Sequence, residues 1–237
     1  MINNDICAYC RTTIIKAENC ANSRSVEHLI PNAALTRKRK NNEGDFYVCR
    51  DCNARKSNID NILGKVTKMQ SPNSSMATDT LIGEIAKEER RFVEMLQRVS
   101  QHKDWVEFTI PIDGDELVEY MTFLGKGQYL KTTGSIFNEA THVMTLEYIS
   151  KDIFVELEAS YRQKHKSNPF RDLEQNLYSE VVNGGQCIIW CKNDRYLFIF
   201  HDNTAVIIEI LERNHINMEK SKKSIDYILT NFRRLPE

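Results

Sequence analysis

Two cysteine pairs, each with the spacing C-x2-C, constrain the fold of this chain more than any other feature. Cys7 and Cys10 form the first pair, and Cys49 and Cys52 form the second. Each pair can present two thiolates to one ion from a tight turn, so together they predict a tetrahedral four-sulfur site. We expect zinc there in a structural role, because four thiolates leave no coordination position open. An iron site of the same geometry is the alternative metal site, and four unconnected cysteines are the alternative without a metal.

The other cysteines and the N-terminal residues bear on where the protein resides. The chain has seven cysteines, an odd number, and its first stretch, MINNDICAYC, lacks the basic start and apolar segment of a secretory signal. Paired cysteines in such a chain are more often metal ligands than disulfides. We interpret Cys20, Cys187 and Cys191 as reduced, structural residues. No apolar run approaches the roughly 18 to 20 residues of a spanning helix, and we expect a cytoplasmic protein.

A segment of 38 residues separates the two cysteine pairs, whereas a zinc ribbon usually has about 15 to 20 residues there. Within it, SVEHLIP at 25–31 has the pattern of a short strand ended by its proline, and DFYVC at 45–49 has the pattern of a partner strand. The stretch CNARKSNIDNILGKV at 52–66 follows as a helix with Asn53 near its start. The sequence thus predicts an α+β protein that begins with a zinc-stapled unit of two strands and one helix.

The ordered combination of CAYC, EHLIP and CRDCNARKS resembles the HNH nuclease family, of the ββα-metal type. The resemblance covers residues 7 to about 60, a quarter of the chain. It implies that His28 is the general base of phosphodiester hydrolysis, and that Glu27 and Asn53 bind a catalytic divalent ion, Mg²⁺ or Mn²⁺. The chemistry agrees, because histidine titrates near neutral pH and hard cations prefer carboxylate and amide oxygens. The expected catalytic residues are therefore His28, Glu27 and Asn53.

Two positions depart from the family pattern. Where members carry an aspartate as the acidic ligand, this chain has Glu27, whose side chain is longer by one methylene. The middle residue of the pattern falls shortly before the second cysteine pair, where Asp45 and Asn42 are the two candidates. Its usual task in the family is to brace the loop and orient the histidine through hydrogen bonds, which Asp45 can also do.

Basic residues gather in the first third of the chain. Residues 1–70 hold 12 Lys and Arg against 7 Asp and Glu, whereas the remainder is net acidic. We expect a polyanion to meet this basic part, and the resemblance implies nucleic acid, which we interpret as double-stranded DNA. The predicted nucleic-acid contacts are Arg37, Lys38, Arg39, Lys40, Arg55 and Lys56. The alternatives are a solvated loop or a localisation patch at 37–40, and ordinary surface charges at Arg55 and Lys56.

A stretch rich in Ser, Thr, Asn and Pro at 69–80 marks a predicted boundary between a nuclease module at 1–70 and an α+β domain at 80–237. In that domain we expect helices at 81–100, capped by Thr78 or Asp79, at 115–125, ended by Gly125, at 170–182 and at 222–232. Strands are expected at 105–112 and 141–149. Apolar runs at 186–192, 195–201 and 204–211 predict an antiparallel β-meander.

These features predict a metal-dependent endonuclease with structural zinc, acting in restriction, anti-phage defence or a mobile element by analogy with the family. The C-terminal domain would serve regulation, recognition of a protein partner or of a modified substrate, or self-association. The alternative function is a non-catalytic zinc module that binds nucleic acid or protein. An enzyme activity of the C-terminal domain has no motif behind it, and we interpret its scattered histidines as structural or surface residues: His142, His165, His201 and His215.

Overall fold

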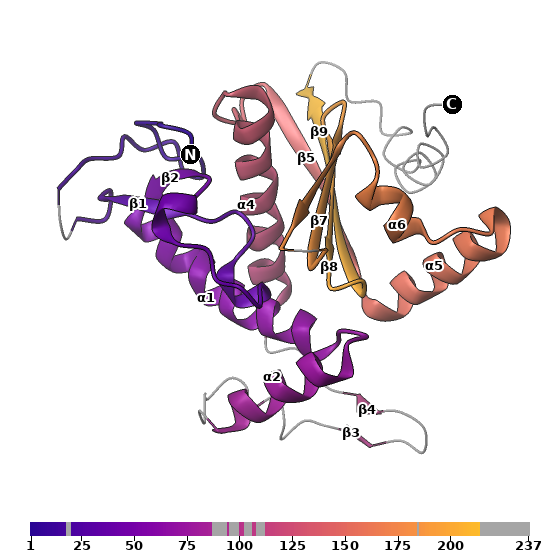
Figure 1. Ribbon diagram of the computed structural model, residues 1–237. Coiled ribbons are helices and arrows are strands. Elements are labelled where there is room, and N and C mark those ends of the chain that lie inside the picture. The colour runs from indigo at the N-terminus through magenta and orange to yellow at the C-terminus, as the bar shows by residue number, and fades with distance from the viewer. Residues whose placement is uncertain are drawn as a thin grey trace.

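A central helix separates the N-terminal part of the molecule from a five-stranded sheet (Figure 1). The computed structural model describes residues 1–17, 20–86, 94, 100–101, 106–107, 112–183 and 185–213. The central helix, α4, spans Gly114–Thr133. The protein is α+β, as the sequence predicts, and none of the described helices is long and apolar enough to cross a lipid bilayer.

The N-terminal part contains the predicted order of strand, strand and helix. Strands β1 (Arg24–Glu27) and β2 (Phe46–Cys49) pair in antiparallel register, with Glu27 opposite Phe46. Two short 3-10 helices, η1 (Asn32–Ala34) and η2 (Asn41–Glu43), lie in the connection between the strands. Helix α1 (Arg50–Met69) follows β2 directly. Strand β1 ends at Glu27, before the proline that the sequence suggested as its end, so His28 begins the connection.

The second helix starts earlier than predicted. Helix α2 spans Ser74–Ala86, so the expected cap at Thr78 or Asp79 is wrong. Asn73 supplies the cap instead, because its side-chain oxygen accepts a hydrogen bond of 3.2 Å from the backbone N–H of Met76. Most of the predicted helix beyond Ala86 lies outside the described residues. Of the strand predicted at 105–112, β4 (Val106–Glu107) is described, paired with β3 (Ser100–Gln101).

The prediction that Gly125 ends a helix is wrong, because α4 continues to Thr133. It stops at Gly134, whose φ of 72° is the left-handed conformation common after a helix. Gly125 and Gly127 are internal and let the helix lie close to its neighbours. A Cβ at Gly125 would lie 2.8 Å from the sulfur of Met144, and one at Gly127 would lie 2.5 Å from Cδ1 of Leu29. These glycines therefore serve packing and do not end the helix.

The sheet confirms the predicted meander and the strand predicted at 141–149, and it adds one edge strand that was not predicted. Its order is β5-β9-β8-β7-β6, antiparallel throughout. The strands are β5 (His142–Ile149), β6 (Ser179–Val182), β7 (Cys187–Lys192), β8 (Arg195–Phe200) and β9 (Thr204–Glu212). The helix predicted at 170–182 is wrong in its second half, because 179–182 pairs with β7 as an edge strand. The C-terminal helix predicted at 222–232 lies outside the described residues.

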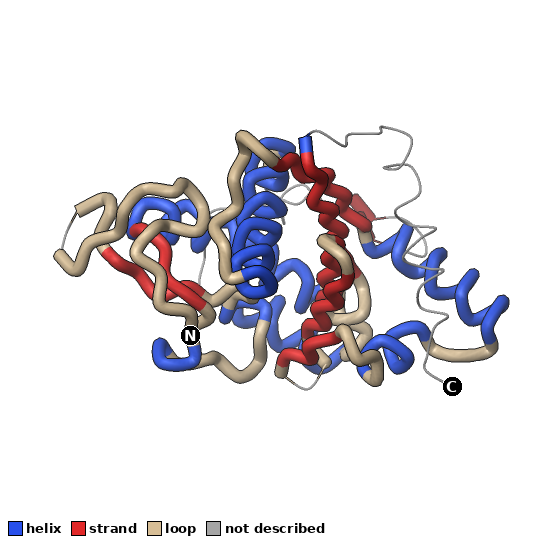
Figure 2. The backbone as a smooth tube through the Cα atoms, turned by 90° about the horizontal axis from the view of Figure 1, so that it is seen from above, coloured by secondary structure: helices blue, strands red, loops and turns tan. Residues whose placement is uncertain are grey.

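Helices cover both faces of this sheet (Figure 2). On one side lie α5 (Lys151–His165) and α6 (Pro169–Glu174), which pack on Ile188 and Trp190 of β7. On the other side lies α4, which packs on the alternate residues Cys187 and Ile189. Side chains alternate between faces along a strand, which explains why β7 is apolar at every position from Cys187 to Cys191.

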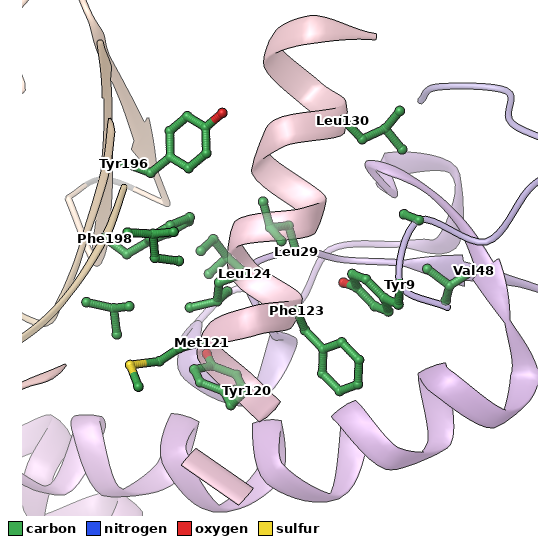
Figure 3. Close-up of a cluster of buried hydrophobic side chains, with 14 of the residues drawn as sticks. Tyr9, Leu29, Val48, Tyr120, Met121, Phe123, Leu124, Leu130, Tyr196 and Phe198 are labelled. Atoms are coloured by element: carbon green, nitrogen blue, oxygen red, sulfur yellow. The ribbon is translucent and has the colours of Figure 1, made fainter. Parts of the chain in front are cut away.

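One hydrophobic cluster runs from the cysteine-rich turn through α4 to the sheet (Figure 3). Tyr9 contacts Phe123 of α4, with ring centroids 4.5 Å apart, and Leu124 is fully buried on the same helix. Phe198 of β8 belongs to the same cluster. The division into domains at 1–70 and 80–237 stays a prediction, and this cluster joins residues from both sides of that boundary.

Candidate metal centre and adjoining pocket

The four predicted zinc ligands come together at the start of α1. The sulfur atoms of Cys7, Cys10, Cys49 and Cys52 all lie within 4.8 Å of one another, and those of Cys10 and Cys49 are 3.6 Å apart. Sulfurs around a tetrahedral zinc, with Zn–S bonds of about 2.3 Å, are about 3.8 Å apart. The spacing and the four-thiol donor set therefore fit a structural zinc ion.

Backbone groups around the cluster favour thiolates. The N–H of Cys49 donates to the sulfur of Cys7 at 3.3 Å, and the N–H of Cys52 donates to the sulfur of Cys49 at 3.4 Å. Both N–H groups lie at the N-terminus of α1, where the helix dipole also favours negative charge. A hydrogen bond from Cys52 lowers the pKa of the Cys7 thiol to about 4, so this ligand is ready to bind as a thiolate.

The remaining cysteines lie away from this cluster. Cys187 is buried under α4, and Cys191 is partly buried on the same strand. Burial raises the pKa of Cys187 well above its usual range, so it stays a neutral thiol. Cys20 is exposed on the loop before β1.

Three predicted catalytic residues line one pocket. Glu27, His28 and Asn53 border a surface pocket of about 460 Å³ between the end of β1, the η1 segment and α1. The side-chain N–H of Asn53 donates to the hydroxyl of Ser25 at 2.6 Å, which leaves the amide oxygen as its remaining polar atom. The Nε2 atom of His28 lies 3.0 Å from the carbonyl oxygen of Lys40. A carbonyl only accepts, so Nε2 carries a proton and Nδ1 is the basic nitrogen of a neutral ring.

Glu27 belongs to a buried ion cluster at the back of this pocket. Its Oε1 atom lies 2.9 Å from the ammonium of Lys56, and that ammonium lies 2.8 Å from Oδ2 of Asp60. Lys56 has no exposed side-chain surface, and its ammonium is also 3.4 Å from the carbonyl oxygens of His28 and Leu29. Lys56 therefore ties the segment that carries His28 to α1. A phosphate contact by Lys56 is not supported by this buried position.

Burial and ion pairing shift the pKa values of this cluster in opposite directions. Desolvation raises the pKa of the Asp60 carboxyl to about 7, and the attraction of Lys56 offsets only part of that effect. Burial raises the pKa of Glu27 in the same way. Burial lowers the pKa of Lys56, but the attraction of Asp60 and Glu27 outweighs it, so the pKa of this lysine is raised. The ammonium is thus charged and holds two carboxyl groups together.

Asp60 is a pocket residue that the sequence interpretation missed. It lines the same pocket as Asn53, seven residues earlier on α1. Two helical turns separate these residues, so they share one face of the helix. That spacing, together with Lys56 between them, was the available signal in the sequence. The pocket therefore offers two carboxyl groups, one imidazole and several asparagine amides, among them that of Asn53.

Asp45 braces the connection after His28. Its Oδ2 atom accepts a hydrogen bond of 2.8 Å from the backbone N–H of Leu29. Arg39 and Lys131 lie 3.1 and 3.3 Å from the same carboxylate. Burial raises the pKa of Asp45, but these two cations more than compensate, so its pKa is lowered and it stays ionised. Asn42, the other candidate for the middle position of the pattern, is exposed in η2.

The predicted nucleic-acid contacts fall into separate groups. Arg37, Lys38 and Lys40 are exposed on the connection between the strands. Arg39 instead turns inward to Asp45 and donates to the carbonyl oxygen of Ile30 at 2.6 Å, so its placement does not support a nucleic-acid contact. Arg55 pairs with Glu119 of α4 at 2.9 Å and lines a different pocket, near Cys10. Only part of the predicted basic set therefore lies beside His28.

Comparison of the chain with protein-family models, with curated proteins and with solved structures gave no match. Fold and site together define an α+β protein with a four-cysteine cluster able to hold zinc, next to a polar pocket.

Proposed function

We propose that this chain is a metal-dependent endonuclease of the HNH type that hydrolyses phosphodiester bonds in double-stranded DNA. The residues that the sequence assigns to catalysis, Glu27, His28 and Asn53, are separated by up to 26 positions and still line one pocket. A zinc module with only a structural task does not require this convergence. It is the single observation that favours an enzyme over a non-catalytic zinc module.

The residues of the pocket suit general-base hydrolysis. His28 accepts a proton from water at Nδ1, while its Nε2–H bond to Lys40 fixes the orientation of the ring. The amide oxygen of Asn53 and the carboxylates of Glu27 and Asp60 are the donors that would hold Mg²⁺ or Mn²⁺, because hard cations prefer oxygen ligands. When bound, such an ion stabilises negative charge on the phosphate and the leaving oxygen. Asp45 supports these residues indirectly, because its carboxylate accepts a hydrogen bond from the backbone N–H of Leu29, next to His28.

The biological setting that suits such an enzyme is restriction, anti-phage defence or a mobile element. This assignment rests on analogy with the HNH family. The residues after 80 would then serve recognition of a protein partner or a modified substrate, regulation, or self-association.

Plasmid nicking by His28→Ala tests this function. Wild-type protein should nick or linearise plasmid DNA with Mg²⁺ or Mn²⁺, and His28→Ala should cut at least about 100-fold more slowly, because a general base contributes roughly 10²- to 10⁴-fold. His165→Ala, on the far side of the sheet, is the matched control and should cut normally. Zinc content, measured by mass spectrometry, should be equal in all three proteins. Unchanged cutting by His28→Ala would refute the proposed role, and no cutting by wild type with either ion would favour the binding module.

A further inference from the structure

A second hollow continues from the catalytic pocket along α1. This groove has a volume of about 830 Å³ and lies between the η1 segment, α1 and α2. Asn32, Ala33 and Asn61 line both the groove and the pocket that contains His28. Figure 1 shows α2 beside the C-terminal end of α1, where the groove is formed. The two hollows are therefore one continuous surface.

The charge of the groove is positive. The described residues that line it include Lys38 from the strand connection and Lys65 and Lys68 from α1, and Asp79 is the one acidic residue among them. The other lining residues are uncharged, and most carry amide or hydroxyl groups. Lysines with hydroxyl and amide side chains are the groups that contact phosphate and sugar oxygens.

The lining also indicates which form of nucleic acid fits. Among the described residues that line the groove, none is aromatic. Proteins that hold single strands usually stack bases on aromatic side chains. A groove with cations and no stacking surface instead suits a duplex, whose bases stay paired and whose phosphates face outward.

Gly83 provides a separate indication of a ligand. This residue lies inside α2 and lines the groove. A Cβ at Gly83 would meet no described atom within 4 Å outside its neighbours and its own helix backbone. Glycine inside a helix costs about 0.5 to 1 kcal/mol relative to alanine, and close approach of a ligand to the backbone is one reason to retain it. Packing within the described part of the chain does not explain this glycine.

Turns of the C-terminal sheet hold one wall of the groove. The backbone N–H of Thr36 donates to Oε1 of Gln186 at 2.8 Å, and Nδ2 of Asn183 donates to the carbonyl oxygen of Arg37 at 3.2 Å. His201, buried and with a positive φ of 50°, lies 2.7 Å from the carbonyl oxygen of Ala34 through Nε2. The C-terminal part therefore positions the segment that carries Lys38.

We propose that this groove binds the phosphate backbone of double-stranded DNA and guides one strand to the pocket of His28. The substrate class rests on the function proposed above, whereas the binding surface is assigned from the groove itself. Lys38 and Lys65 contact phosphates, and the α2 backbone at Gly83 lies against the duplex. The C-terminal sheet contributes by fixing the wall that carries Lys38.

Salt-dependent binding tests the two lysines. A labelled DNA duplex is titrated with the zinc-saturated, full-length protein at several salt concentrations, without added Mg²⁺ or Mn²⁺ so that cleavage is prevented while the structural zinc stays bound. The double variant Lys38→Gln/Lys65→Gln should bind about tenfold or more weakly, and the slope of log affinity against log salt should fall by about 1.8, since each lost phosphate contact contributes about 0.9. The control Lys151→Gln/Lys164→Gln alters exposed lysines of α5, across the sheet, and should leave affinity and slope unchanged.

Gly83→Leu tests the backbone approach independently. Leucine favours the helix, so the melting temperature should be kept or raised, while affinity for the duplex should fall because the side chain enters the groove.

The possible outcomes separate the groove from the catalytic function. If the lysine variants and Gly83→Leu bind as wild type does while His28-dependent cleavage persists, the groove proposal is overturned and the nuclease stands. If the lysine variants and Gly83→Leu weaken duplex binding as expected yet wild type cuts nothing, the groove stands and the nuclease falls. Absence of duplex binding at low salt, or a tenfold preference for single-stranded DNA or RNA, overturns the groove as a duplex site.

Discussion

Lys56 has a different role from the phosphate contact predicted from the sequence. On an exposed helix face it would be a cation for phosphate, but here it is fully buried between the carboxyl groups of Glu27 and Asp60. It also lies beside the carbonyl oxygens that follow β1. A buried cation with several acceptors fixes the relative position of the segments it joins. Lys56 thus holds the backbone of His28 against α1.

Replacing Lys56 by Met should be strongly destabilising. The change leaves Glu27 and Asp60 buried without their cation, and breaking a buried pair costs about 3 to 5 kcal/mol. Urea unfolding of zinc-saturated protein measures the loss. Lys164→Met, at an exposed position of α5, is the control and should change stability by less than about 0.5 kcal/mol. Adding Glu27→Gln and Asp60→Asn to Lys56→Met should recover part of the loss. A single-variant cost below about 1 kcal/mol would show that the cluster is not an interdependent unit.

Several short elements meet at the four-cysteine cluster. The paired strands β1 and β2 have four residues each, and a hairpin of this size is marginal on its own. The cysteine sulfurs join the turn at 7–10 to the end of β2 and the first turn of α1. A metal ion bound by four thiolates would therefore fix the hairpin against the helix and stabilise the shape of the pocket that His28 lines.

Removing one ligand should release the metal and loosen this part of the protein. Elemental analysis should find one zinc per wild-type chain and less than a tenth of that in Cys52→Ser. The variant should also lose several kcal/mol of stability, because structural zinc binding contributes roughly 10 to 16 kcal/mol in small zinc modules. Cys20→Ser changes an exposed cysteine outside the cluster and should keep both zinc and melting temperature. Full stability of Cys52→Ser without zinc would contradict a structural metal.

Across the whole molecule, the sequence predicts local patterns better than tertiary contacts. Cysteine spacing and the succession of apolar runs correctly predict the four clustered cysteines and the meander, because both patterns depend on near neighbours in the chain. The prediction that Gly125 ends a helix is wrong because glycine at this position allows the close approach of Met144 and Ile208, which are distant in the sequence. The helix predicted at 179–182 is wrong because pairing with β7 makes these residues a strand. The place of Asp60 in the pocket and the burial of Lys56 likewise depend on the packing of α1 against the segment around Glu27.

Because the cysteine-rich part and the sheet share one hydrophobic cluster, we expect them to unfold together. Gly127 of α4 lies tightly against the N-terminal part of the chain. A Cβ at this position would lie 2.5 Å from Leu29 and 2.8 Å from Phe46, both fully buried. Gly127→Ala should therefore cost about 1 to 3 kcal/mol through overpacking. Gly114→Ala, at the start of the same helix with no described atom near the new Cβ, should be neutral.

Two probes during urea unfolding measure this coupling: zinc release, detected with a chromogenic chelator, and circular dichroism of the whole chain. Because one core includes both parts, the two midpoints should coincide in wild type and shift together in Gly127→Ala. If zinc release moves to lower urea while the main change in circular dichroism stays in place, the two parts unfold independently. That result would favour the separate domains expected from the boundary at 69–80 over a single cooperative unit.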